Sequence, residues 1–575
     1  MTASPIIRVR DLVKEFRTPR RAPGVSGALR TLFTREQNVV RAVDGISFDI
    51  AQGELVGYLG RNGAGKSTTI KMLTGILVPT SGEVVVSGRV PWRARERNAL
   101  DIGVVFGQRS YLWWDLPLID SFELIRRMYR MDAATYRREL DRVVELLELD
   151  ELLGTPVRQL SLGQRMRGDL AAAIVYRPRI LYLDEPTVGV DVLAKEHIRA
   201  FIAETNRSEG TTVVLTTHDL RDVERLCRRL ILIERGTVLF DGRIDELRSR
   251  YAVGRPADGG RCRRGAGSAR PARCRRGPAR GLPGLAHRVS GPRGDRPPDL
   301  RRAHRVARVS AALFSTAWQM ARLEMQTFLS WRLNLGLQVL GMLARVYFVS
   351  AVWTAVYAGR AEVDGVPLET LIAYLTLANI HVWVIYPQTL DVLPPRIRSG
   401  AIALDLARPI GLLPQLVARS VGGIAGLTAI VIGLLPIAFL VGSLRWPASA
   451  EAGALYLVGV VLAYAITLAI GIVLGLIAFW TLETNGIGLL YYFVNLFFAG
   501  ALVPLWAMPD WVQKIAELLP FQTQAYLPIS IYFGRLAGTE ALRALGIQAV
   551  WLALMWSLAV LVWRRAIHRV VVQGG

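Results

Sequence analysis

The sequence has little that would support metal, redox or secretory chemistry. Its three cysteines, Cys227, Cys262 and Cys274, have neither metal-ligand spacing nor a disulfide pattern. The first ten residues, MTASPIIRVR, lack the apolar stretch of a signal peptide. We therefore expect no redox function, and we expect the N-terminal domain to stay in the cytosol.

Acidic residues are scarce beside basic ones, and the formal net charge is +23. If that excess were evenly spread, it would indicate nucleic acid or anionic lipid as a partner. However, residues 252–308 contain sixteen arginines and three aspartates, with no lysine or glutamate. More than half of the excess comes from this stretch, so the sequence predicts no nucleic-acid partner.

Long apolar runs, by contrast, are abundant in the second half. Hydrophobic residues make up 51% of the chain and the mean hydropathy is +0.30, which is high for a soluble protein. A run of about 20 apolar residues can span a bilayer as a helix. Six runs fit: Leu333 to Ala358, Leu368 to Leu390, Val421 to Val441, Leu455 to Trp480, Ile487 to Trp506 and Leu545 to Trp563.

Arginines predict how these spans are oriented. They crowd the loop after the second span and follow the sixth span, whereas the loop after the first carries Glu362 and Asp364. Both termini should therefore lie in the cytosol, in a multi-pass protein of the inner (cytoplasmic) membrane. Residues 313–332 should form an interfacial amphipathic helix, and the proline-broken stretch 508–534 a re-entrant or interfacial hairpin on the outer side.

The composition divides the chain into three parts. Residues 1–250 alternate short β-branched runs with charged helical stretches, which predicts a soluble α/β domain. Residues 251–310 are rich in Arg, Gly, Pro and Ala, which is typical of a disordered linker, and residues 311–575 form the membrane domain. A frameshift that joins two neighbouring reading frames would produce the same composition in the middle part, so both origins stay open.

Three motifs follow one another in the soluble domain. GRNGAGKS at residues 60–67 fits a phosphate-binding loop, whose glycines let backbone N–H groups approach phosphates. LSLGQ begins at Leu160 and LYLDEP at Leu181. A phosphate loop alone is compatible with every class of P-loop nucleoside triphosphatase. The three motifs in this order are not compatible with every class.

Together the motifs resemble those of the ABC nucleotide-binding domain, over roughly residues 6–245. The resemblance implies an α/β P-loop ATPase that binds ATP and Mg²⁺. The residues that it assigns to nucleotide binding are Phe16, Gly60, Asn62, Gly63, Ala64, Gly65, Lys66, Ser67, Thr68, Gln108, Ser161, Gly163, Gln164 and Asp184.

The resemblance also implies roles for single residues. Lys66 would hold the β and γ phosphates, and Ser67, Gln108 and Asp184 would lie at Mg²⁺. Glu185, directly after Asp184, would be the catalytic base that polarises the attacking water.

Two further positions depend on the same resemblance. His218, in LTTHD, would contact the γ-phosphate, and Phe16 would stack on adenine in place of the more usual tyrosine. Taken alone, His218 would be an ordinary histidine at a strand end. Its place after the DEP motif and an apolar strand favours the catalytic interpretation.

LSLGQ departs from the family pattern because Leu162 replaces the first glycine of the usual pair. Ser161 and Gly163 remain, and the resemblance implies that they contact a nucleotide bound to another subunit. The chain has one copy of the motif, so we expect a second copy or a homologous ABC subunit as partner.

The membrane half resembles ABC type-2 export permeases. The resemblance rests on six spans, an N-terminal interfacial helix and the segment IRSGAIALDLARP at Ile397 to Pro409, which is similar to a cytoplasmic loop of daunorubicin and viologen exporters. Arg345 in the first span could snorkel to the interface or contact substrate or lipid. His381 and Asn379 could form an interhelical hydrogen bond or face a translocation path.

The function predicted is ATP-driven export of a small lipophilic or amphipathic solute, with membrane lipid around the spans. A glycan or glycolipid exporter of the same permease type is the alternative, and an importer is a weaker one because no coupling sequence of binding-protein-dependent permeases is found. Translation-associated or repair ABC ATPases would carry no spans. The sequence does not name the cargo.

Overall fold

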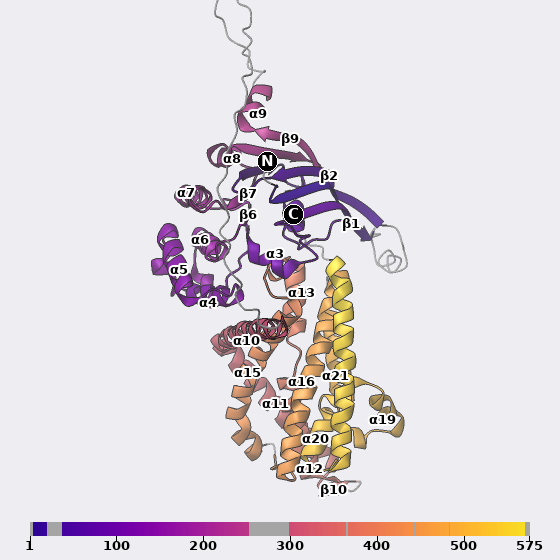
Figure 1. The fold of residues 1–575 in the computed structure, drawn as a ribbon. Helices are drawn as coiled ribbons and strands as arrows, with labels where there is room; N and C mark the ends of the chain where they lie inside the picture. The colour runs from indigo at the N-terminus through magenta and orange to yellow at the C-terminus, as the bar shows by residue number, and fades with distance from the viewer. Residues whose placement is uncertain are drawn as a thin grey trace, which may run out of the picture.

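The computed structural model describes residues 4–19, 37–107, 109–251, 298–363, 366–441, 444–481 and 484–569. These residues form an α/β domain and a bundle of long helices, and one end of the bundle meets the α/β domain (Figure 1). The two parts agree with the fold class expected from the sequence, an ABC-type ATPase domain followed by a helical membrane domain.

The core of the first domain is a six-stranded sheet in the order β5-β6-β7-β3-β8-β9, in which only β9 runs antiparallel to its neighbour. β6 and β7 are buried along their whole length, as runs such as ILYLD and TVVLTT predict for central parallel strands. The strands of this six-stranded sheet are β3 (Leu55–Gly60), β5 (Ile102–Phe106), β6 (Ile180–Asp184), β7 (Thr212–Thr217), β8 (Arg229–Glu234) and β9 (Thr237–Arg243).

A second, antiparallel sheet in the order β2-β1-β4 covers one side of this domain. Its strands are β1 (Ile7–Pro19), β2 (Gln37–Ile50) and β4 (Ser81–Val86). The helices of the domain are α2 (Lys66–Leu73), α3 (Arg95–Asp101), α4 (Leu118–Met128), α5 (Ala133–Leu147), α6 (Leu162–Ile174), α7 (Val192–Glu209), α8 (Leu220–Leu226) and α9 (Ile244–Tyr251), with short 3₁₀ turns at Asp150–Leu152 and Val157–Gln159.

The membrane domain is helical apart from the small hairpin β10 (Glu362–Val363) and β11 (Val366–Pro367). Its longer helices are α10 (Pro298–Ser330), α11 (Arg332–Tyr357), α12 (Leu368–Val384), α13 (Thr389–Arg398), α15 (Leu412–Val441), α16 (Ala450–Leu476), α18 (Asn485–Phe498) and α21 (Thr539–Ala566). The shorter ones are α14 (Ile402–Leu406), α17 (Ala478–Thr481), α19 (Asp510–Glu517) and α20 (Tyr526–Tyr532), with 3₁₀ turns at Leu505–Ala507, Pro520–Thr523 and Ile567–Arg569.

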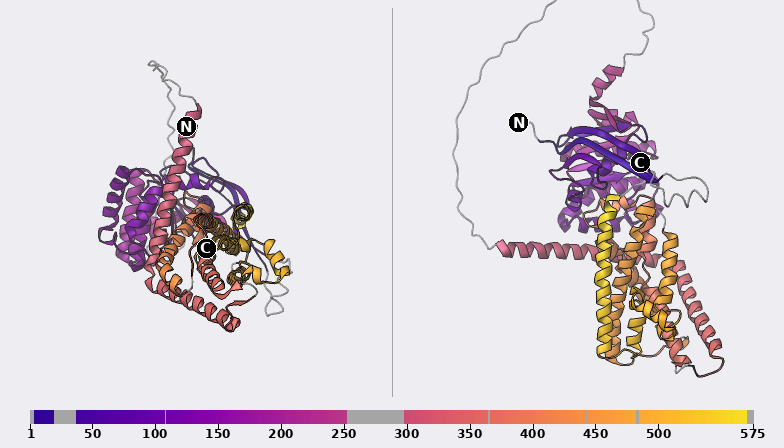
Figure 2. Two further views of the ribbon diagram at one scale, coloured as in Figure 1. Left: turned by 90° about the horizontal axis from the view of Figure 1, so that it is seen from below. Right: turned by 90° about the vertical axis from the view of Figure 1, so that its right-hand side faces the viewer.

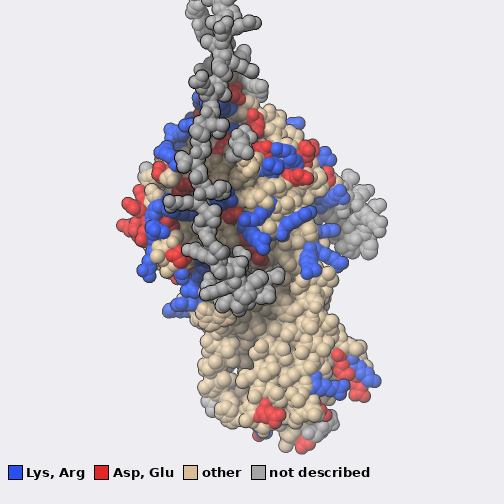
Figure 3. Space-filling view, viewed as in Figure 1, with Lys and Arg blue, Asp and Glu red and all other residues tan. Residues whose placement is uncertain are grey.

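Five helical segments within the described residues are long and apolar enough to cross a membrane: Arg332–Tyr357, Leu368–Arg398, Leu412–Gly433, Ala450–Thr481 and Thr539–Arg569. They match five of the six predicted spans. In Figure 3 the surface of the helical half is almost free of charge over a broad band, whereas the ATPase domain carries both signs. This band is the surface that a bilayer requires.

The fifth predicted span, Ile487 to Trp506, differs from the prediction. α18 ends at Phe498, and its 14 residues extend over about 21 Å, which is short of the ~30 Å hydrocarbon core. The chain turns at Gly500, which has a φ of +73°, and continues through short helices up to α20. The prolines at 509, 520 and 528 do break the following segment, as expected.

α10 also differs from its predicted extent. The helix begins at Pro298, inside the stretch that composition assigned to a linker, and lies across the ends of the spans nearest the ATPase domain (Figure 2). Proline is well suited to the first turn of a helix because the missing N–H has no partner there. The prediction of a linker at 252–297 falls outside the described residues.

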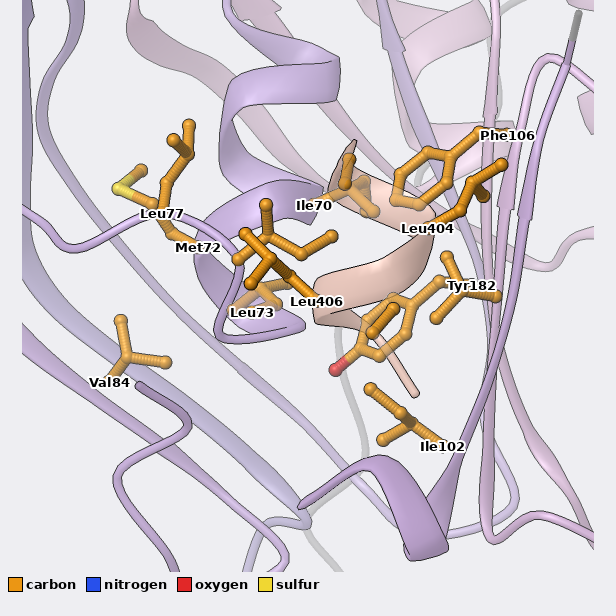
Figure 4. Close-up of a cluster of buried hydrophobic side chains, with 14 of the residues drawn as sticks. Ile70, Met72, Leu73, Leu77, Val84, Ile102, Phe106, Tyr182, Leu404 and Leu406 are labelled. Atoms are coloured by element: carbon orange, nitrogen blue, oxygen red, sulfur yellow. The ribbon is translucent and has the colours of Figure 1, made fainter. Parts of the chain in front are cut away.

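The two domains share one hydrophobic core, which explains how the membrane half contacts the ATPase half. Leu404 and Leu406 of α14 insert among side chains of α2 and the central sheet, including Ile70, Leu73 and Tyr182 (Figure 4). Both leucines are buried. The segment Ile397 to Pro409 therefore joins the membrane domain to the core of the ATPase domain.

Candidate nucleotide site

The candidate phosphate loop connects β3 to α2. Gly63 and Gly65 have φ values of +80° and +103°, and a Cβ on Gly65 would lie 2.4 Å from the carbonyl oxygen of Ala42. Only glycine fits this position without strain. Together with the N-terminus of α2, such a loop offers backbone N–H groups to an anion.

Lys66 supplies the positive charge at the base of the loop. Its side chain is buried, and Nζ donates hydrogen bonds to the carbonyl oxygens of Gly60 (2.7 Å) and Arg61 (3.2 Å). Nζ also lies 3.6 Å from Oε1 of Glu185. The lysine therefore connects the loop with the predicted catalytic base.

Asp184 is at the end of β6 and is held by two hydroxyl groups. Ser67 Oγ donates a hydrogen bond to Asp184 Oδ1 at 3.2 Å, and Thr216 Oγ1 of β7 donates to the same oxygen. A hydroxyl beside a carboxylate is a pair of hard oxygen donors that suits Mg²⁺. Within the described residues no group of three or more His, Cys, Asp and Glu side chains could form a metal cage.

Glu185 has a backbone conformation that is rare for a residue with a side chain. Its φ is +55°, and its N–H donates to the carbonyl oxygen of Thr216 at 3.0 Å. Strain of this kind persists where the surrounding structure determines a geometry. Nδ1 of His218 lies 3.5 Å from Glu185 Oε1, so the two predicted catalytic side chains do come together.

A cavity of about 910 Å³ collects most of the predicted residues. Its lining includes Phe16, Asn62, Gly63, Gly65, Lys66, Ser67, Thr68, Asp184 and Glu185. Gly60 and Ala64 lie behind this lining, where Ala64 is buried and a Cβ on Gly60 would meet Ile233. Gln108 lies outside the described residues. The size of the cavity is at the upper end of the range for small-molecule sites.

Four basic residues in the lining were not predicted: Arg41, Lys71, Arg109 and Arg235. Lys71 lies one helical turn after Ser67, and Arg109 follows Gln108, so spacing along the chain could have indicated both. Arg41 and Arg235 reach the cavity only through tertiary packing. Burial, and then the charge of Arg109, lower the pKa of Lys71 to about 8. The number of basic residues in the lining and the lowered pKa of Lys71 both fit a cavity that receives an anion.

The LSLGQ motif lies outside this cavity. Ser161 is the N-cap of α6: its hydroxyl accepts a hydrogen bond from the N–H of Gln164 at 3.2 Å, and the Gln164 side chain accepts one from the N–H of Ser161 at 2.9 Å. Ser161 is exposed to solvent, and Gly163 is partly exposed. The motif therefore does not contribute to the nucleotide cavity of its own chain.

The nucleotide cavity and the membrane domain meet at Arg109. Gly400, in the turn between α13 and α14, has a φ of +71°, and a Cβ there would lie 2.6 Å from a guanidinium nitrogen of Arg109. The arginine side chain thus lies directly over this turn. A residue that lines the cavity touches the membrane domain.

Asp405 of α14 is the centre of the charges at this junction. Its carboxylate is buried and accepts hydrogen bonds from Arg396 (2.6 and 2.9 Å) and Arg408 (3.0 Å), with Arg419 at 3.8 Å. Burial alone would raise the pKa of Asp405, but the arginines outweigh it and hold the pKa at about 2. The aspartate is therefore ionised at neutral pH.

The same arginines contact the ATPase domain through an aromatic ring. The guanidinium carbons of Arg408 and Arg419 lie 4.6 and 5.3 Å from the ring centroid of Trp113, close enough for cation–π attraction. Nearby, Arg127 of α4 donates a hydrogen bond to Ser315 of α10 at 2.9 Å. The junction thus combines an apolar insertion with charged contacts.

The ionisable residues singled out in the spans have partners in other helices. Arg345 of α11 donates to the hydroxyl of Tyr492 on α18 at 3.0 Å, and His381 Nδ1 of α12 lies 3.4 Å from the hydroxyl of Tyr456 on α16. Asn379 donates to the carbonyl oxygen of Ala501 at 3.4 Å. His381 thus contacts another helix, which agrees with the interpretation as an interhelical hydrogen bond, whereas Asn379 contacts the turn after α18.

Comparison with known families finds two matches in this chain. Residues 43–188 match the family described as ABC transporter, and residues 343–574 match the family described as ABC-2 family transporter protein. The first match contains the phosphate loop, LSLGQ and Glu185. The second begins inside α11 and contains the helices from α12 onwards.

Among curated proteins, the ATPase half is similar to several ATP-binding proteins. It is 36% identical over 217 residues to Nod factor export ATP-binding protein I of Ralstonia nicotianae, covering 37% of this chain and 64% of that protein. It is also 36% identical over 212 residues to a daunorubicin resistance ATP-binding protein of Streptomyces coeruleorubidus, covering 36% and 66%. The chain thus spans just under two thirds of the length of these relatives.

Among solved structures, an ATP-binding subunit of an ABC transporter matches with 23% identity and a TM-score of 0.37, covering 43% of this chain and 94% of that one.

The linearmycin resistance ATP-binding protein of Bacillus subtilis is a further curated relative. It is 34% identical over 208 residues, covering 36% of this chain and 66% of that protein.

Proposed function

We propose that this chain, an ABC transporter that joins an ABC ATPase domain to an ABC-2 family membrane domain, uses ATP hydrolysis to export a lipophilic or amphipathic solute. The observation that carries the proposal is the continuous path from the nucleotide cavity, through Arg109 and Gly400, into α13 and the spans. Chemistry in the cavity can then move the membrane helices, which is what active transport requires.

In the cavity, each residue has a role that its position supports. Lys66 and the loop N–H groups would hold the β and γ phosphates, and Phe16 would stack on the adenine ring. Ser67 and Asp184 would hold Mg²⁺, with Gln108 as a further ligand, and the ion would neutralise charge that develops on the phosphates. Glu185, beside Asp184 and His218, would accept the proton of the attacking water.

The direction of transport is proposed from the relatives and from the membrane domain. One relative is named for Nod factor export and another for resistance to daunorubicin, and outward transport would account for both functions. The arginine-rich loops face the ATPase domain, which favours both termini in the cytosol and a place in the cytoplasmic membrane.

The transport proposal can be tested in cells that overproduce the chain. The wild type should lower the accumulation of a lipophilic cationic dye, and Lys66→Ala should abolish this difference while membrane insertion is preserved. Lys195→Ala, at a partly exposed position of α7 outside the cavity lining, is the matched control and should behave as the wild type. Dye uptake that rises with the wild-type chain and depends on Lys66 would indicate an importer.

The active unit should contain two nucleotide-binding domains, either from a second copy or from a homologous ABC subunit. The support is that exposed Ser161 and partly exposed Gly163 lie outside the cavity of their own chain. ATP should tighten the dimer of a Glu185→Gln variant, measured by mass photometry in detergent, and Ser161→Ala should weaken that effect. Full ATPase activity in a species with one nucleotide-binding domain would contradict the proposal.

A further inference from the structure

A second cavity lies between the ATPase domain and the adjacent ends of two spans. It measures about 410 Å³, and in Figure 1 the helix that forms its upper wall, α3, lies on the underside of the ATPase domain beside α13 and the near end of α21. The ATPase wall contains Trp92, Arg93, Arg95 and Arg97. The nucleotide cavity shares none of these residues.

The charge of this junction cavity is strongly positive. Within the described part of the chain, Arg93, Arg95 and Arg97 form no ion pair with a carboxylate. Glu96 lies among them, but it is a single carboxylate, and a Cβ on Gly411 would be only 2.9 Å from its Oε1. Arg408 also lines the cavity, but Asp405 already balances it.

Arg95 is the most informative of these side chains. Its Nε donates a hydrogen bond to the carbonyl oxygen of Gly75, whereas its Nη2 is buried and has no hydrogen-bond partner. Burial lowers the pKa of Arg95 to about 10, so the group is still charged at neutral pH. A charged group with an unsatisfied buried donor is costly, and an anion that contacts the guanidinium from the cavity would offset part of this cost.

The opposite wall is apolar and comes from the membrane domain. Leu412 begins α15, and Trp563 and Ile567 lie at the end of the last span. Tryptophan is enriched at the depth of lipid headgroups, and Arg564 and Arg565 follow directly in the sequence. The cavity thus has basic groups on one side and hydrocarbon on the other, at the level where lipid headgroups lie.

We propose that this junction cavity binds the phosphate of an anionic membrane lipid, with Arg93, Arg95 and Arg97 around the phosphate and Trp563 and Leu412 against the glycerol and upper acyl chain. Guanidinium groups bind phosphate through paired hydrogen bonds. Free inorganic phosphate would satisfy the arginines, but it would leave the apolar wall in contact with water. The geometry therefore favours a lipid, and the proposal does not depend on the cargo or on the direction of transport.

The test compares lipid retention in full-length variants. Wild type, Arg93→Gln/Arg97→Gln and the control Arg130→Gln/Arg137→Gln would be reconstituted in phosphatidylcholine nanodiscs with and without phosphatidylglycerol. Phosphatidylglycerol bound per chain would then be measured by native mass spectrometry. All four arginines are exposed, but only Arg93 and Arg97 line the cavity, where a basic side chain beside an anionic headgroup is worth about 5-fold in affinity. The first double variant should therefore bind about 30-fold more weakly.

The control and the wild type should retain the lipid equally. Equal retention by the Arg93→Gln/Arg97→Gln variant would overturn the site, provided that its thermal unfolding midpoint in lipid-free detergent matches the wild type. If both double variants lost the same amount of bound lipid, the effect would be one of general surface charge, and the proposed site would be wrong.

A second measurement distinguishes the two sources of phosphate. Trp563→Ala should weaken retention of phosphatidylglycerol, and excess inorganic phosphate should displace little of the lipid from the wild type. If inorganic phosphate displaced the lipid completely and Trp563→Ala had no effect, the site would be one for a free anion, and the lipid assignment would be wrong.

Discussion

The nucleotide cavity and the domain junction around Asp405 both bury charge, but they balance it differently. In the nucleotide cavity, Lys71 and Arg235 belong to the lining and have no ion pair among the described residues, whereas Arg41 pairs with Glu15 and Asp44. At the junction, Asp405 contacts three arginines within the protein. The difference teaches that the first site leaves positive charge for a ligand, whereas the second uses its charges to hold two domains together.

The largest effect should follow from removing the base of the nucleotide cavity. Glu185→Gln should slow ATP hydrolysis by ~10² or more while ATP binding is retained, because a positioned general base contributes on this scale. Phosphate release at saturating ATP, together with nucleotide binding at equilibrium, checks both parts. Glu204→Gln, on the exposed face of α7, should have wild-type rates. Wild-type-like turnover in Glu185→Gln would remove Glu185 from this role.

The junction should respond to charge removal through stability rather than through chemistry. Asp405→Asn keeps the volume but leaves buried arginines without their anion, which costs about 3 kcal/mol when a buried pair is broken. The thermal unfolding midpoint of the purified protein should fall. Because the contact between the two domains is weakened, the membrane domain should also have less influence on the rate of ATP hydrolysis.

Asp510→Asn is the matched control, because Asp510 is exposed at the start of α19. It should leave the midpoint unchanged. If Asp405→Asn were as stable as the wild type, the arginines would not depend on Asp405, and the comparison between the two sites would fail.

The nucleotide cavity could be predicted from the sequence because its residues occur in short motifs. Lys66 and Ser67 lie in one loop, Asp184 and Glu185 end one strand, and parallel strands bring such ends to one edge. Arg41 and Arg235 could not be predicted in this way, because each reaches the cavity from another strand or turn. The hydrogen bond from Thr216 to Asp184 likewise depends on the pairing of β6 with β7.

The junction was only partly predictable. The segment Ile397 to Pro409 was singled out by resemblance, but nothing in its sequence shows that Leu404 and Leu406 enter the core of the ATPase domain. The fifth predicted span failed for a related reason. Apolar composition continues to Trp506, but the backbone turns at Gly500 against Tyr374 and Leu505, which is a tertiary contact.

The smallest effect predicted concerns the edge of the nucleotide cavity. Phe16 lines the cavity from β1, and Nζ of Lys14 lies 5.4 Å from its ring centroid. If Phe16 stacks on adenine, Phe16→Ala should weaken ATP binding by roughly 10-fold, since stacking of an aromatic ring on a base is worth about 1–3 kcal/mol. Phe16→Tyr should bind as the wild type does, because the ring is kept.

This variant also separates binding from catalysis. Phe16 enters the cavity from β1, whereas Asp184 and Glu185 lie at the end of β6, so the substitution should raise the KM for ATP and leave kcat nearly unchanged. A ring that served only the fold would lower the unfolding midpoint and would not discriminate ATP from other nucleoside triphosphates. Equal KM values for ATP in the wild type and in Phe16→Ala would exclude stacking, and adenine recognition would then belong to other residues of the lining.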